Sequence, residues 1–408
     1  MPLDDLERRV CGVIERRGAD MLRDLAAHVA IPTGANFKPG LDEYREAALA
    51  RLRALGATVT LVAGDPRPEW LELPGATCGE EVIPPVAIAR AKHVPDLPRV
   101  LIAGHLDTVH DPHGDFRELS IAPDGRTAVG PGAVDMKGGI VIALAALEAL
   151  AECGVPCNWS FLLNSDEETG SFHSARALSE AAREHDVGLA LEPAMPDGGL
   201  VVSRMGAGQF KVEAFGRSAH VGRDFAKGVS AVAALARVLL KLDGLARPSE
   251  GVIVNVGPLQ GGSVTNAVPD HAACWGNVRF ADEGSARQLG REFDLLATGQ
   301  DGLPRIVVHR AFNRPAKPLI TRVRTLADEA RAVAQDLGQA LPFGSTGGVC
   351  DGNILQEAGL PTIDTLGVRG GNLHTRDEFV EVASLVDRAA LFAVLLKRLA
   401  RNRRSAKV

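Results

Sequence analysis

The stretch RVLIAGHLDTV, residues 99–109, decides the fold class. Its first six residues form a short apolar run, which is typical of a strand buried on both faces of a sheet. Helical patterns flank this run: residues 41–55 repeat apolar side chains at helical spacing before Gly56, and residues 138–151 are predicted to form a second helix. This alternation predicts an α/β domain in which helices cover both faces of a mixed, largely parallel sheet.

The pattern changes near residue 206, where strand-like segments become frequent. Four segments are predicted to be strands and two to be helices: residues 209–215, 252–256, 272–280 and 305–312, and residues 229–242 and 283–297. After about residue 315 the earlier alternation returns. We therefore predict that residues 206–314 form an inserted α+β sandwich of ferredoxin-like type, which separates two parts of the larger domain, residues 1–205 and 315–408.

The overall composition is that of a folded globular protein. The 408 residues are 46% hydrophobic and 24% charged, and the formal net charge is −6. Because phosphate binding needs a concentrated basic surface, we do not expect a nucleic-acid partner. A short basic tail, residues 397–407, is interpreted as the end of an amphipathic helix in solvent.

The amino terminus and the cysteines bear on the compartment. The first ten residues lack the pattern of a secretory signal, and no apolar run approaches the roughly 18 residues of a membrane span. We therefore expect a cytoplasmic protein without membrane contact. The six cysteines show no paired metal spacing and are predicted to be free thiols, although Cys153 and Cys157 leave a zinc site open as an alternative.

Two polar residues follow the apolar run at the point where the strand ends. His105 and Asp107 are two residues apart on an extended chain, so their side chains point to the same side. Open α/β sheets place binding sites at the carboxyl ends of strands. His105 could then bind a metal while Asp107 accepts a hydrogen bond from its ring and fixes the tautomer. Taken alone, the pair also fits a strand that ends with a surface histidine.

A glycine-rich turn, GPGAVDMKGG at residues 130–139, delivers Asp135 just before a helix. Glycines permit the tight backbone that brings a carboxylate into a crowded site, and one carboxylate can bridge two cations. Glycine-rich turns also bind phosphates, but the spacing of dinucleotide-binding and Walker motifs is absent. The turn therefore favours a metal ligand.

Three acids follow a second apolar strand in LLNSDEETGS, residues 162–171, where Asp166, Glu167 and Glu168 are consecutive. Carboxylates this close repel one another, and a buried cluster of them is costly unless a cation compensates. Because adjacent side chains diverge at a strand end, one glutamate can bind metal while its neighbour faces the substrate. The alternative is a solvated acidic loop.

Two further residues complete the set of potential metal ligands. Glu192 closes an apolar strand in LALEP, and His374 follows a glycine turn in GGNLHTRDE. Two nearby zinc ions need one histidine and one acid each, with a shared acid between them, and the chain offers this set. A glutamate without a metal contact would then serve as the base.

These motifs resemble the family of co-catalytic zinc hydrolases that includes bacterial glutamate carboxypeptidase, acetylornithine deacetylase, succinyl-diaminopimelate desuccinylase and aminoacylase. The resemblance covers nearly the whole chain and is nearest to the glutamate carboxypeptidase-like branch. It rests on motifs in the family's order: GHLDTV, GAVDMKGG, SDEETGS, SAHVGRDFAKG, TNAVPD, NVRF and NLHTRDE. The resemblance implies that the inserted domain is a lid that mediates dimerisation.

The resemblance also implies a role for each motif residue. It implies two zinc ions per subunit, with Co²⁺ or Mn²⁺ as possible substitutes. Their ligands would form two sets that share one aspartate: His105, Asp135 and Glu192, and Asp135, Glu168 and His374. Glu167 would be the general base, and Asp107 would orient His105.

Other matched residues would contact the substrate. His220 of one subunit would reach the active site of the partner and stabilise the oxyanion. Asn266 and Arg279 match positions that hold the carboxylate of the substrate, with the backbone of Gly347 and Gly348 nearby. Without the resemblance, His220 fits a surface histidine and Arg279 an ordinary exposed arginine. Three departures leave the specificity pocket undefined: Asn277, Val349 and Cys350.

The sequence therefore predicts hydrolysis of an amide bond adjacent to a free carboxylate in a small peptide or an N-acyl amino acid. A carboxypeptidase that releases a C-terminal amino acid such as glutamate is the favoured activity. A deacylase of N-acyl amino acids would use the same residues, and a non-catalytic dimeric binding protein is a third interpretation. A serine hydrolase is disfavoured, because the GxSxG motif is absent.

Overall fold

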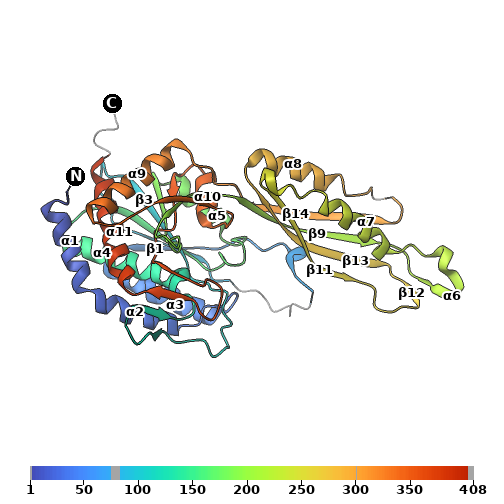
Figure 1. Ribbon diagram of the computed structural model, residues 1–408, viewed down its shortest axis with the longest axis horizontal. Helices are drawn as coiled ribbons and strands as arrows, with labels where there is room; N and C mark the ends of the chain where they lie inside the picture. Colours follow the sequence, from blue (N-terminus) through green and yellow to red (C-terminus); the bar gives the residue numbers. More distant parts are fainter. Residues whose placement is uncertain (1, 75–82, 300, 403–408) are drawn as a thin grey trace.

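The computed structural model describes residues 2–74, 83–299 and 301–402. Figure 1 shows an α/β domain at one end of the long axis and the inserted domain at the other. Five cysteines in the described part are free thiols, and Cys78 lies outside it. None of the helices in these ranges combines the length and the apolar content that a membrane crossing needs.

A six-stranded sheet forms the centre of the α/β domain. Its strands, in spatial order, are β1 (Thr58–Val62), β2 (Val86–Arg90), β6 (Asn158–Asn164), β3 (Arg99–His105), β7 (Val187–Ala190) and β16 (Thr362–Ile363). The strands β6, β3, β7 and β16 run parallel, whereas β1 and β2 pair in antiparallel fashion. The predicted mixed, largely parallel sheet is therefore confirmed.

Helices cover both faces of this sheet, as predicted. Alternate residues of β3 point to opposite faces, so that Val100 and Ile102 join one hydrophobic cluster and Leu101 and Ala103 join another. The first cluster is covered by α1 (Asp5–Arg16), α2 (Gly18–Ala30), α3 (Lys38–Ala54), α4 (Gly138–Glu152), α9 (Thr321–Asp336) and α11 (Ala383–Asn402). The second is covered by α5 (Ala175–Arg183) and α10 (Asp351–Glu357).

The inserted domain is built on an antiparallel sheet with its own core. The spatial order of the strands is β11 (Val252–Gly261), β13 (His271–Phe280), β9 (Gly206–Phe215) and β14 (Arg305–Arg314). Residues such as Phe210 and Cys274 face the helices α7 (Ala231–Asp243) and α8 (Glu283–Asp294) in a separate hydrophobic cluster. The alternate residues, among them Trp275 and Arg279, occupy the opposite, open face of the sheet.

Two linkers join the inserted domain to the α/β domain, and they are fastened to each other. The backbone N–H of Arg204 donates to the carbonyl of Lys317, and the N–H of Lys317 donates to the carbonyl of Arg204. The carboxylate of Asp364 accepts hydrogen bonds from the Arg204 guanidinium at 2.8 and 3.1 Å and lies 3.2 Å from Lys317 Nζ. Asp364 and Lys317 are fully buried, so the linkers are tied together at one point.

The first residues of the basic carboxyl-terminal segment are less exposed to solvent than predicted. Lys397 is 3% exposed and contacts the carboxylates of Asp4 and Glu7, and Arg398 donates to Glu7 and Asp336. The interpretation of this part as a helix end in solvent is wrong, because acids of α1 and α9 neutralise the basic side chains. Residues 403–408 lie outside the described part.

Candidate metal centre

The candidate site lies at the carboxyl edge of the parallel strands. His105 is the last residue of β3, Glu192 follows β7 by two residues, and the acidic segment at residues 166–168 follows β6. Parallel strands that end side by side bring their following residues together, which is why segments far apart in sequence converge here.

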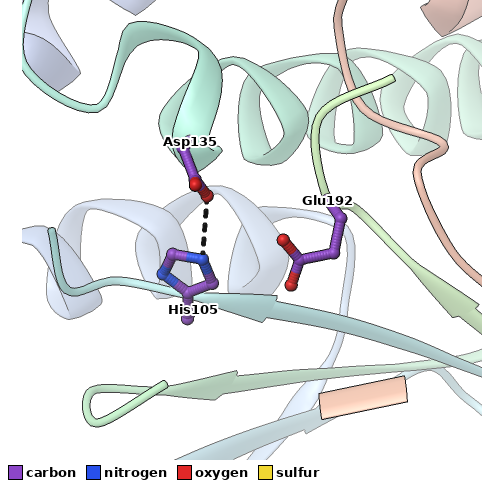
Figure 2. A group of neighbouring side chains, drawn as sticks. All are labelled: His105, Asp135 and Glu192. Carbon is purple, nitrogen blue, oxygen red and sulfur yellow. Dashed lines mark hydrogen bonds and ion pairs between the residues drawn. The ribbon is translucent and has the colours of Figure 1, made fainter. Parts of the chain in front are cut away.

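The first group of potential ligands consists of His105, Asp135 and Glu192, all of them buried. One ligand atom from each residue lies within 4.8 Å of the others. The Nε2 atom of His105 is 3.2 Å from Oδ1 of Asp135, and the carboxylate of Glu192 points toward the same space (Figure 2). One imidazole and two carboxylates around a common point are suitable ligands for a divalent metal.

The second group consists of Asp135, Glu168 and His374. The Nε2 atom of His374 lies 3.6 Å from Oδ2 of Asp135 and 3.3 Å from Oε2 of Glu168. The two oxygens of Asp135 therefore face different histidines, which suits a carboxylate shared between two cations. The Oε1 atom of Glu168 is buried and has no hydrogen-bond partner among the described residues. Such an atom is suited to bind a cation.

Glu378 fixes the turn that carries Asp135. Its buried carboxylate accepts hydrogen bonds from the N–H groups of Gly132, Val134 and Asp135 at 3.0 to 3.1 Å. Its Oε2 atom is also 2.7 Å from Nε2 of His110. Glu378 follows His374 by four residues and therefore connects the turns that carry two potential ligands. The sequence did not indicate this role, because Glu378 is only the final residue of the motif GGNLHTRDE.

Lys137 supports the same turn from the other side. Its buried ammonium donates to the carbonyls of His28 and Ile31, at 3.0 and 2.7 Å. These carbonyls lie at the end of α2 and just beyond it, so the amino-terminal helices help to position Asp135. Burial lowers the pKa of Lys137 to about 7.

Asp107 contacts both His105 and the acidic segment. Nδ1 of His105 lies 2.9 Å from the backbone carbonyl of Asp107 and 3.5 Å from its Oδ1 atom. The carboxylate itself accepts hydrogen bonds from the N–H groups of Glu167 and Glu168, at 3.2 and 2.9 Å. The predicted carboxylate contact with His105 is therefore accompanied by a closer contact to the backbone. Burial alone would lower the pKa of His105, but hydrogen bonds to Asp107 and Asp135 raise it well above its usual range.

Glu167 lies beside the two groups of ligands and belongs to neither of them. Its Oε1 atom accepts a 2.8 Å hydrogen bond from Arg314, the last residue of β14. Burial raises the pKa of Glu167 to about 8, against the opposing effect of the Arg314 charge. The arrangement places a carboxyl group beside the two groups of ligands, where it could accept and release a proton.

Arg314 is a residue of the site that the sequence analysis did not find. It is 2% exposed and also donates to Asp351, Ser171 and the carbonyl of Glu167. The Asp351 carboxylate in turn accepts from Asn164, the last residue of β6. Arg314 therefore contacts the carboxyl groups of Glu167 and Asp351, and it joins the inserted domain to the segment that carries Glu167.

A cavity of about 510 Å³ extends from these residues to the inserted domain. Glu167, Glu168 and His374 line it on one side. The open face of the inserted sheet lines the other side with four polar residues: Gln209, Asn277, Arg279 and Asn313. Nη1 of Arg279 is buried without a hydrogen-bond partner in the described ranges, and burial together with the charge of Arg314 lowers the Arg279 pKa.

The predicted glycines lie near this cavity. Gly348 lines it directly, and its carbonyl accepts a 3.2 Å hydrogen bond from Arg204. Gly347 precedes it in the chain. Cys350, which departs from the family pattern, is buried and caps the first turn of α10. Its side chain therefore contacts the backbone at the start of the helix, where Asp351 lies.

His220 and Asn266 are not brought to this cavity within one chain. They lie at the far end of the inserted domain, where β10 (Ala219–His220) pairs with β12 (Ala267–Val268) (Figure 1). The two segments are close to each other, because the N–H of Val221 donates to the carbonyl of Asn266 at 3.1 Å. Nδ1 of His220 accepts from the N–H of Gly222.

The alternative zinc site at Cys153 and Cys157 gains no support. Neither residue belongs to a group of three potential ligands within the part of the chain that the structure describes. Both are free thiols, and burial raises the pKa of Cys157 to about 12.

Comparison with protein families gives a match to one described as peptidase family M20/M25/M40, over residues 101–398. Among curated proteins, the chain is 27% identical to carboxypeptidase G2 of Pseudomonas sp. over 92% of this chain and 88% of that protein. It is 29% identical to succinyl-diaminopimelate desuccinylase 2 of Shewanella loihica over 74% and 85% of the two chains.

Solved structures share the fold. A tripeptidase from Staphylococcus aureus superposes with a TM-score of 0.74 at 22% identity, covering 94% of this chain and 99% of that one. An aminopeptidase PepT from Bacillus cereus gives a TM-score of 0.72 at 20% identity, with the same coverage. At these identities the likeness concerns the fold alone.

Proposed function

Because the chain belongs to peptidase family M20/M25/M40 and is a metal-dependent hydrolase, we propose that it cleaves an amide bond next to a free carboxylate. One observation carries this proposal: two groups of ligands share Asp135, while Glu167 and Arg279 line one cavity beside them. The first group would hold an ion between the strand ends, and the second would hold one at the mouth of the cavity.

The donor atoms fit two zinc ions. His105, Asp135 and Glu192 would hold one, and Asp135, Glu168 and His374 the other, so each ion would have an imidazole nitrogen and carboxylate oxygens. Co²⁺ or Mn²⁺ could replace zinc, since the same ligands accept them. When bound, such ions polarise a carbonyl group and lower the pKa of water from about 16 toward about 7.

The side chains around the ions would perform the remaining tasks. Glu167 would take a proton from the attacking water and pass it to the leaving nitrogen. Arg314 holds one oxygen of Glu167, which fixes the direction of this carboxylate. Arg279 would bind the free carboxylate of the substrate through charge-assisted hydrogen bonds, and the backbone at Gly347 and Gly348 would border it.

His220 and Asn266 would complete the site from a second subunit. They lie together at the end of the inserted domain far from the cavity (Figure 1), so a homodimer through residues 206–314 would present them to the partner. His220 would then stabilise the oxyanion, and Asn266 would contact the carboxylate.

Mixing two inactive variants tests the shared site. We expect that heterodimers of His220→Ala with Glu167→Gln subunits recover about half of the activity of the wild-type dimer, because each heterodimer contains one site with both residues and one site with neither. Activity would be measured after the subunits are exchanged and the heterodimer is purified with two affinity tags. Verified heterodimers that stay as inactive as either parent would contradict the contribution from the partner.

Two classes of substrate are compatible with this proposal. Release of a C-terminal amino acid such as glutamate is favoured by the similarity to carboxypeptidase G2 over most of both chains. Removal of an acyl group from an amino acid is the second candidate, favoured by the similarity to the desuccinylases.

A substrate screen tests the proposal. Zinc-reconstituted protein would be incubated with glutamate conjugates, dipeptides and N-acyl amino acids, and the released amine would be quantified. Hydrolysis that disappears on metal removal is the expected result. Metal binding without hydrolysis of any amide would instead favour a non-catalytic dimeric binding protein.

A further inference from the structure

The second group of potential ligands is completed by a residue on an exposed loop. The side chain of His374 is 53% exposed, whereas those of Asp135 and Glu168 are 11% and 8% exposed. The loop has φ angles of +57° at Asn372 and +63° at His374, in the left-handed region that side chains other than glycine rarely adopt. Contacts made by neighbouring residues are therefore needed to keep His374 in its position.

Hydrogen bonds within the loop of His374 maintain its shape. The hydroxyl of Thr375 donates to the carbonyl of Asn372 at 2.7 Å and accepts from the N–H of Asp377 at 3.2 Å. The side-chain amide of Asn372 donates to the carbonyl of Asp377 at 3.2 Å. These bonds connect residues of one loop, so they do not determine where the loop lies relative to the other ligands.

A second loop, residues 110–117, contacts the loop of His374 through Arg376, and we call it the facing loop. The guanidinium of Arg376 donates to the carboxylate of Asp115 at 2.6 Å. The same group lies over the ring of Phe116, 5.7 Å from the ring centroid. Because Arg376 follows His374 by only two residues, these contacts restrain the backbone that carries the imidazole.

The facing loop is itself attached to the first group of ligands. The Phe116 ring packs edge-on against the ring of His110, with centroids 5.2 Å apart and an interplanar angle of 72°. Nε2 of His110 lies 2.7 Å from Oε2 of Glu378, and the carboxylate of Glu378 also holds the turn of Asp135. The facing loop thus joins the turn that carries one ligand to the loop that carries another.

The contacts of Arg376 are weak by the standard of folding stability. Arg376 and Asp115 are 69% and 82% exposed, and an exposed ion pair contributes little to the free energy of unfolding. Metal affinity responds to smaller effects, however. If a ligand occupies its binding position for only part of the time, the affinity for the metal falls by that fraction. A contact that matters little for folding can therefore change the affinity for one metal ion.

We propose that Arg376 and Phe116 are positioning residues that hold His374 in place for the second metal ion. This inference rests on the proposed function, in which His374 binds that ion together with Asp135 and Glu168. Neither Arg376 nor Phe116 offers an atom to a metal ion, so both act through the position of the loop. The first group of ligands is buried and does not include His374. A change at the facing loop should therefore affect the second ion more than the first.

Titration of the metal-free protein with Co²⁺ tests this assignment without a substrate. Co²⁺ accepts the same ligands, and its absorption bands report its coordination, so two binding steps can be followed separately. His374→Ala should lose one step, which identifies the step that belongs to the second group. We expect Arg376→Gln and Phe116→Leu each to raise the dissociation constant of that step by about three- to tenfold. The other step should change by less than about twofold, since its ligands stay in place.

Matched variants separate positioning from a general loss of stability. Arg376→Lys keeps the charge and should keep part of the affinity, and Asp115→Asn should have a smaller effect than Arg376→Gln, because the contact with Phe116 remains. Arg324→Gln removes an exposed arginine of α9 that likewise pairs with an acid and lies over a phenylalanine ring, and it should change neither step. Thermal unfolding of each variant would be measured beside the titrations. If Phe116→Leu unfolds, the variants at the exposed Arg376 decide the question.

The other outcomes distinguish this inference from the proposed function. If the Arg376 and Phe116 variants bind both Co²⁺ ions as tightly as wild type, or weaken both steps equally, the positioning role is overturned and the proposed function stands. If wild-type protein binds fewer than two Co²⁺ ions, the pair of metal sites is contradicted, and with it both the proposed function and this inference.

Discussion

The two ends of the cavity are built in opposite ways. At the metal end, the turn of Asp135 is held by three N–H groups on Glu378, and the segment of Glu167 and Glu168 is held by two N–H groups on Asp107. At the other end, Arg279 has a buried nitrogen without a partner in the described part of the chain. At the metal end the protein fixes the backbone of the segments that carry the ligands, whereas at the other end the side chain of Arg279 leaves a hydrogen bond for a ligand. The difference indicates where binding energy can favour one substrate over another.

The largest effect is expected for Glu167→Gln, which tests whether the metal end contains a base that does not bind metal. We expect kcat to fall by about 10² to 10⁴, since the amide cannot take a proton, while both metal ions remain bound. Single-turnover rates and metal content would be measured together. Glu180→Gln, an exposed acid on α5, is the matched control. Loss of a metal ion from the Glu167 variant would mean that the roles of Glu167 and Glu168 are exchanged.

A smaller effect is expected for Glu378→Gln, which weakens the hydrogen bonds that hold the turn of Asp135 but removes none of the potential metal ligands. The amide offers one acceptor oxygen for the three N–H groups, so we expect metal affinity to fall by about 10- to 100-fold. Competition with a chelator would measure the affinity. Turnover should recover at saturating metal, and Glu381→Gln, near it in sequence but paired with Arg369, should change neither quantity. If the metal affinity of the Glu378 variant is unchanged, the hydrogen bonds from Glu378 to the turn of Asp135 are not needed for metal binding.

The smallest effect is expected at the other end, for Arg279→Gln. We expect KM to rise by about tenfold with metal content unchanged, because one charge-assisted contact to the substrate carboxylate is lost. Steady-state kinetics with an acid substrate and its uncharged amide would measure this. The KM of Arg279→Lys should lie between those of wild type and Arg279→Gln, since lysine keeps the charge without the paired hydrogen bonds. An equal loss for both substrates would contradict a role in carboxylate recognition.

The potential metal ligands could be located from the sequence because each one follows an apolar strand or a glycine turn. His105, Glu192 and the acids after β6 all lie at strand ends, and strand ends of a parallel sheet meet at one edge. The fold class followed from the same apolar runs. The pairing of the acids with particular ions came from the resemblance and has its counterpart in the geometry around Asp135.

The supporting residues could not be predicted, since their role depends on contacts between distant segments. Arg314 ends a strand with ordinary alternation, and nothing in that pattern indicates an ion pair with Glu167, 147 residues away. β16 is only two residues long, because Asp364 leaves the sheet to bind Arg204 and Lys317.

The shared attachment of both linkers to Asp364 limits how the inserted domain can move. Because the linkers pair with each other and with one carboxylate, sliding or splaying them apart would leave a buried charge without its partner, at a cost of about 3 to 5 kcal/mol. Rotation about a single axis through this point is the motion that keeps these bonds. The contact of Trp70 with Trp275 and His309 then sets how far that rotation can go before a bond breaks. The contacts of Trp70 therefore limit how far the inserted domain can move away from the α/β domain.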